Sequence, residues 1–129
     1  RSSTGFDNKR LNMLLAVLEK RAGFQLGAKD VFLNLAGGIR LDDPGLDLAV
    51  MVAILSSSLD TAIPKGYTFA AEVGLSGELR NVPKMEQRMQ EAAKLGFERM
   101  IVAQKVTSAP KGLEVIRLAT IQELVAHLF

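Results

Sequence analysis

The chain has 129 residues, no cysteine, and a formal net charge of +2 from 16 basic and 14 acidic residues. This length suits one domain, and the lack of cysteine excludes disulfides and thiolate chemistry. A single histidine excludes a multi-histidine metal site. The longest apolar run, residues 48–55, is far shorter than the roughly 20 residues that span a bilayer. We therefore expect a cytoplasmic protein without a membrane partner, and the charge alone gives little support for nucleic-acid binding.

The first third of the chain predicts a tail, a helix and a strand. Residues 1–6 are expected to be a linker. Leucines recur at helical spacing over residues 8–22, with Asp7 placed to cap that helix and Gly23 to end it. Apolar side chains alternate over residues 30–36, which predicts a strand.

A second helix is expected to begin at Asp43-Pro44, because a carboxylate before a proline is a strong helix start. Residues 48–55 are apolar all round, so this helix should be buried on most sides. The three serines at 56–58 are expected to end it.

Residues 67–128 predict four strands and two helices, the last opened by a capping box at Thr120 and Glu123. The strands are expected at residues 67–73, 77–82, 99–103 and 113–118, with helices at 83–95 and 120–128. This mixed order with hairpins predicts an α+β domain over residues 7–129, in which helices pack on a mixed sheet.

Two segments resemble the active-site motifs of Lon-type serine proteases. The segment DDPGLDLA (residues 42–49) resembles the Lon nucleophile loop Asp-Gly-Pro-Ser-Ala-Gly, but Gly45 stands where Lon has its serine. The segment EVGLSGE (residues 72–78) resembles the Lon motif Gly-Glu-(Ile/Val)-x-Leu-x-Gly, and ungapped counting places Lon's catalytic lysine at Glu86. The resemblance implies a Lon proteolytic-domain fold. Since neither residue can serve in a serine–lysine pair, it also implies a degenerate site with no protease activity.

Four segments, residues 11–21, 31–41, 47–49 and 72–82, closely resemble the C-terminal domain of the bacterial RadA (Sms) family of DNA repair proteins. The resemblance covers residues 5–128. A related alternative is another ATPase with an appended Lon-like domain, such as the magnesium-chelatase-related group; the EVGLSGELR segment and the DPGLDLA variant favour RadA.

The RadA resemblance implies a hexameric, ATP-driven motor that acts on branched or single-stranded DNA in recombinational repair, together with recombinase partners. Residues 1–6 would then be the linker from an upstream ATPase domain. ATP, magnesium and zinc would belong to upstream domains, and no cofactor is expected in residues 1–129. The domain itself would be a scaffold for ring assembly and a candidate DNA-contact surface.

Four bases are candidates for DNA contact or for a subunit interface: Arg40, Arg80, Lys84 and Arg88. Lys84 and Arg88 are one helical turn apart. Glutamates interleave with these bases, as on an ordinary solvated helix face, and no aromatics are interleaved for base stacking. The alternative for Arg40 and Arg80 is a surface ion pair, which contributes under about 1 kcal/mol.

Three carboxylates gather at the predicted start of the second helix. Such a cluster could hold a hard cation, but a simpler interpretation assigns each an ordinary role, and no metal site is expected. Asp43 caps the helix, Asp42 is solvated or pairs with Arg40, and Asp47 favours the positive end of the helix dipole. Because Asp47 also needs a base, Arg80 is its candidate partner.

Two other functions stay open from the sequence. One is an active serine-type peptidase of the Lon superfamily that uses other residues. The second is a protein-interaction module that recruits repair partners without touching DNA.

Overall fold

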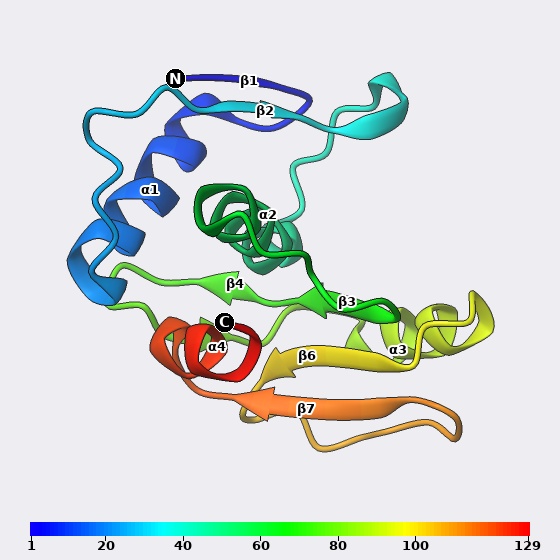
Figure 1. Cartoon of the computed structure of the whole chain (residues 1–129). Coiled ribbons are helices and arrows are strands. Elements are labelled where there is room, and N and C mark those ends of the chain that lie inside the picture. Colours follow the sequence, from blue (N-terminus) through cyan, green and yellow to red (C-terminus); the bar gives the residue numbers. More distant parts are fainter.

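Four α-helices and seven short strands make up the computed structural model, which describes residues 1–129 (Figure 1). The helices are α1 (Asn8–Ala22), α2 (Asp47–Leu59), α3 (Met85–Lys94) and α4 (Ile121–Leu128). The strands are β1 (Ser2–Thr4), β2 (Phe32–Asn34), β3 (Tyr67–Ala70), β4 (Glu72–Val73), β5 (Leu79–Arg80), β6 (Arg99–Ala103) and β7 (Glu114–Leu118). Two 3₁₀ turns, η1 (Ala36–Gly38) and η2 (Pro44–Leu46), precede α2. No helix is both long and apolar enough to cross a membrane.

The predicted boundaries of α1 are confirmed. The Asp7 carboxylate accepts a hydrogen bond from the Arg10 backbone N–H at 3.2 Å, and Gly23 ends the helix in the left-handed conformation. The leucines at 11, 14, 15 and 18 are all fully buried. Amphipathic spacing and capping therefore suffice to define this helix.

Residues 1–6 are more than a tail. Ser2–Thr4 pair in parallel with Phe32–Asn34 as a two-stranded ribbon, and Phe6 is buried in the main core. The sequence could not show this strand, because a three-residue Ser/Thr segment has no apolar alternation. That these residues also connect to an upstream ATPase domain stays a prediction.

The second helix begins as predicted and ends later than predicted. The Asp43 carboxylate accepts from the Gly45 N–H at 2.9 Å, and Pro44–Leu46 form a 3₁₀ turn before α2 proper. The serines at 56–58 remain helical, and Asp60, in the left-handed conformation, ends the helix. Most of α2 is buried, and Figure 1 shows it between the β1–β2 ribbon and β3.

The central sheet has the order β3-β6-β7 and is entirely parallel. Its residues alternate between two cores: Ile101 and Ala103 join a large cluster with α1, α2 and α4, while Met100 and Val102 join a small cluster with α3. The α+β class is confirmed. The expected single mixed sheet is wrong, because β1–β2 and β4–β5 form separate two-stranded sheets.

The predicted strand over residues 67–73 is interrupted at Ala71. Its N–H donates to the Gly45 carbonyl and its carbonyl accepts from the Leu48 N–H, both at 3.2 Å. The start of α2 thus takes the place of a neighbouring strand. After this break, Glu72–Val73 pair with Leu79–Arg80 as an antiparallel hairpin.

Candidate functional site

Gly45, which the motif resemblance aligns with the Lon nucleophile, is buried beneath an arginine. Gly45 is buried in η2 at the start of α2. A Cβ atom at this residue would lie 2.8 Å from Arg88 Nη1 and 3.1 Å from Asp43 Oδ1. The space that a serine side chain would use is therefore occupied by the Arg88 guanidinium.

Arg88 holds this place through three contacts. Its Nη1 lies 2.8 Å from Asp43 Oδ2, its Nη2 donates to Asp43 Oδ1 at 3.0 Å, and its Nε donates to the Pro83 carbonyl at 2.9 Å. The bidentate geometry is the strong form of an arginine–carboxylate pair. The hydrogen bond from Arg88, aided by the Gly45 N–H, lowers the pKa of Asp43 below its ordinary value of 3.8 against the opposing effect of burial.

The Asp43–Arg88 pair predicts a specific pH dependence. Because the folded pKa of Asp43 lies below the ordinary value of 3.8, the stabilisation by the ionised carboxylate is complete above the unfolded pKa. It is lost as pH falls through the folded pKa. Asparagine keeps the cap, so Asp43→Asn should lower the free energy of unfolding at pH 7 by up to about 1 kcal/mol. Urea unfolding at pH 7 and pH 3 should show this difference shrinking at pH 3. A difference of equal size at both pH values would contradict the ionic origin.

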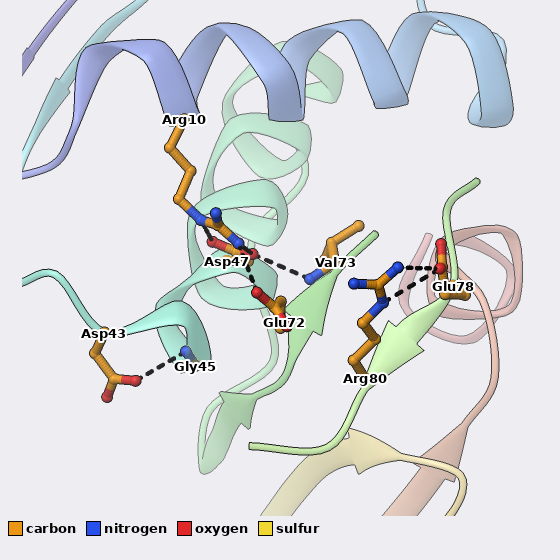
Figure 2. Close-up of polar contacts among 8 residues, drawn as sticks. All are labelled: Arg10, Asp43, Gly45, Asp47, Glu72, Val73, Glu78 and Arg80. Atoms are coloured by element: carbon orange, nitrogen blue, oxygen red, sulfur yellow. Dashed lines mark hydrogen bonds and ion pairs between the residues drawn. The ribbon is translucent and has the colours of Figure 1, made fainter. Parts of the chain in front are cut away.

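A second ionic cluster lies at the same helix start, facing α1 (Figure 2). Asp47 is fully buried. Its carboxylate accepts from Arg10 Nε at 2.6 Å, from the second Arg10 nitrogen Nη2, and from the Val73 N–H at 3.0 Å. Arg10 also contacts Glu72 at 3.2 Å. The hydrogen bond that Arg10 donates to Asp47, more than any other interaction, raises the pKa of Arg10.

The predicted pairing of Asp47 with Arg80 is wrong. Arg80 donates through Nε and Nη2 to Glu78, at 3.2 and 2.8 Å (Figure 2). This hydrogen bonding lowers the pKa of Glu78 and raises that of Arg80. Asp47 instead faces α1, because α2 begins beside that helix. Arg10 is a residue that the sequence did not single out. The available signal was a base one helical turn before Leu14, at the border of the apolar stripe.

The four candidate bases do not form one patch. Arg40, which is 4.0 Å from Asp42 as expected, lines one hollow with Asp43 and Pro44. Lys84 and Arg88 line a groove between β3 and α3, and Arg80 lines a third hollow with Lys105. Glu86 is exposed on α3. Of the four candidate bases, only Lys84 is exposed and has no charged partner within 4 Å.

The three carboxylates also have separate partners. Asp47 points to Arg10, Asp43 to Gly45 and Arg88, and Asp42 is exposed. The structure contains no group of three acidic or histidine side chains arranged to hold a metal ion.

Comparisons with known proteins relate the chain to two named groups. Residues 3–106 match the family described as subunit ChlI of Mg-chelatase. The chain is also similar to proteins named DNA repair protein RadA. The one from Bacillus subtilis (strain 168) is 48% identical over 95% of this chain, and the one from Streptococcus pneumoniae is 46% identical over 100%. The chain spans 28% and 31% of those two relatives, respectively.

A third relative, DNA repair protein RadA from Listeria monocytogenes, is 43% identical over 95% of the chain and 28% of its own length. The RadA resemblance is therefore supported along the whole sequence, whereas the Lon-like fold stays a prediction. Because the family match covers most of its residues, the chain belongs to the family described as subunit ChlI of Mg-chelatase, and its relatives support a protein of the RadA type.

Proposed function

We propose that these residues form a proteolytically inert, Lon-like domain of a RadA-type DNA repair protein, and that the domain acts as a scaffold for ring assembly. The similarity to RadA proteins over 95–100% of the chain supports the repair context. The α+β fold and the two motif segments at the start of α2 and in the β4–β5 hairpin support the Lon-like origin.

The observation on which the proposal rests is the occupation of the nucleophile position. Gly45 has no side chain to attack a peptide bond, and the guanidinium of Arg88 fills the adjacent space while bonded to Asp43. Glu86 is exposed and is a carboxylate, so it cannot act as the basic partner of a serine. Fold and catalysis use different residues, so the scaffold survives the loss of the site.

The wider protein is proposed to be a ring of six copies driven by ATP on branched or single-stranded DNA. ATP, magnesium and zinc would bind upstream domains, and recombinase proteins are proposed partners. Of the four candidate bases, Lys84 is the best placed for a phosphate contact because it is exposed and has no acidic partner. Arg88 and Arg80 are already engaged by Asp43 and Glu78.

Two alternatives have their own discriminating measurements. Covalent labelling of the wild-type chain by a serine-reactive phosphonate would revive the peptidase hypothesis. DNA binding that is absent at low salt would leave the protein-interaction module, since phosphate contacts are strongest there.

Light scattering over a concentration series, with and without DNA, tests the scaffold. We expect association toward a hexamer. A chain that stays monomeric at every concentration would contradict ring contacts within these residues.

Lys84→Asn tests the DNA contact in the same samples, because asparagine tolerates the positive φ of 61° at this position. We expect this variant to bind DNA more weakly and to lower the salt dependence by about 1. Lys111→Asn, at an exposed loop position, is the matched control. Equal losses in both variants would show a non-specific charge effect.

A further inference from the structure

The outer edge of β3 has backbone groups that bond to nothing. The Arg99 N–H donates to the Gly66 carbonyl at 3.0 Å, which turns residues 66, 68 and 70 toward β6. The alternating residues Tyr67 and Phe69 must then direct their N–H and carbonyl groups away from the sheet. No hydrogen bond in the structure engages them. Farther along this edge, only Ala71 is bonded, by the start of α2.

The outer edge of β2 has the same property. The Ser2 N–H donates to the Val31 carbonyl, and the Leu35 N–H donates to the Thr4 carbonyl, both at 3.0 Å. Residues 31, 33 and 35 therefore face β1, and Phe32 and Asn34 present unbonded backbone groups to solvent. The Phe32 side chain is 80% exposed, the highest value among the large apolar residues that are exposed.

These two edges lack the protection that open edges usually have. Charged side chains or proline on an edge strand discourage pairing with another chain. The edge strand β7 contains Glu114 and Arg117, and β1 consists of serine and threonine. By contrast, the sequences of β2 (FLN) and β3 (YTFA) contain neither charge nor proline.

A groove of about 440 Å³ runs between the edge of β3 and α3. Its two ends differ in polarity. Phe97 and the 66% exposed Leu95 lie toward the start of β3, since the Glu98 N–H donates to the Gly66 carbonyl there. Lys84, Gln87 and Arg88 lie toward the other end, where Arg88 covers Gly45.

We propose that β2 of one copy of this chain adds in parallel to β3 of the next copy. In that register Phe32 lies opposite Thr68, so its N–H donates to the Tyr67 carbonyl and its carbonyl accepts from the Phe69 N–H. The Phe32 side chain then enters the apolar end of the groove beside Leu95. Asn34 lies opposite Ala70, at the polar end near Gln87. An antiparallel register would place Phe32 on the opposite face of the sheet, away from this groove.

The contact joins two different surfaces, so it repeats from copy to copy and closes a ring when the rotation allows. A single chain cannot make it internally, because α2 lies between β2 and β3 (Figure 1). The inference rests on the proposed ring scaffold and specifies the surfaces from which the ring is built.

Cross-linking tests the pairing cleanly, because the chain has no native cysteine. The double variant Phe32→Cys/Leu95→Cys, treated with a short bismaleimide, should give a ladder of covalent oligomers. Each single variant should give none, and a mixture of the two singles should give dimers only. The control pair is Phe32→Cys/Leu75→Cys, since Leu75 is 70% exposed in the β4–β5 turn. This pair should give no ladder.

Light scattering of the same samples separates the two proposals. Oligomers that form without a 32–95 cross-link would overturn the β2–β3 pairing and leave the scaffold standing. Dimers from Phe32→Cys alone would overturn it in favour of a two-fold contact. A monomer at all concentrations would overturn both. As a second readout, Phe32→Lys should abolish association and leave the urea unfolding midpoint of the monomer unchanged, because this side chain contributes little to the core.

Discussion

Asp47→Ala is expected to lower the free energy of unfolding by about 3 kcal/mol, because removing one partner of a buried ion pair leaves the charge of the other, Arg10, uncompensated. The variant takes away both Asp47 oxygens, to which Arg10 donates, and leaves the Val73 N–H without an acceptor. Glu72 still contacts Arg10, and the Arg10 side chain is 29% exposed, so the loss should fall at the lower end of the range for buried pairs.

Urea unfolding measures this effect, and two other variants calibrate it. Asp47→Asn keeps an acceptor for Val73 and should lose less than the alanine variant. Asp42→Ala removes an exposed carboxylate and should change stability by less than about 0.5 kcal/mol. A loss at Asp47 as small as that at Asp42 would show that Arg10 and Val73 find other partners in the folded state.

Gly5→Ala is the second change with a large expected effect, a loss of about 3 kcal/mol from backbone strain together with a clash. Gly5 has φ of +83°, and a Cβ atom would lie 2.3 Å from the Ile39 carbonyl oxygen. That oxygen belongs to the backbone and cannot rotate away, and the Gly5 carbonyl accepts from the Leu41 N–H at 2.9 Å. The substitution should therefore separate the chain start from the loop before α2.

Gly23→Ala is the matched control, with φ of +77° but no atom within 4 Å of the added Cβ. Its free energy of unfolding should fall only by the cost of a side chain in the left-handed conformation, about 1 kcal/mol. Equal losses in the two variants, measured by urea unfolding, would show that the contact with Ile39 relaxes without cost.

Local signals in the sequence were sufficient to predict the four helices, although not the end of α2 or the bounds of α3. A carboxylate before proline predicted the start at Asp43, and Thr120 and Glu123 predicted the last helix. In the structure Thr120 Oγ1 accepts from the Glu123 N–H at 3.2 Å, and the Glu123 carboxylate accepts from the Ala119 N–H at 2.6 Å. Each of these features depends on residues within one turn of one another.

Features that depend on distant partners could not be predicted. The strand at residues 2–4 exists because β2 lies beside it, and the break at Ala71 exists because the start of α2 bonds there. The partner of Asp47 lies 37 residues away on another helix, and the sequence offered several bases without a means to choose. Likewise, the absence of a nucleophile at Gly45 was visible, but the arginine that covers this position was not.

The parallel pairing of the strands also determines how the chain must fold. Three of the four strand pairs are parallel, and they join residues as distant as Ser2 with Phe32 and Tyr67 with Arg99. Only the β4–β5 hairpin can close over a short loop. Since long loops must lose their entropy before such contacts are rewarded, we expect the helices and this hairpin to form early. The parallel ladders, which supply both open edges, are then expected to form late, and the domain is expected to fold slowly for its size.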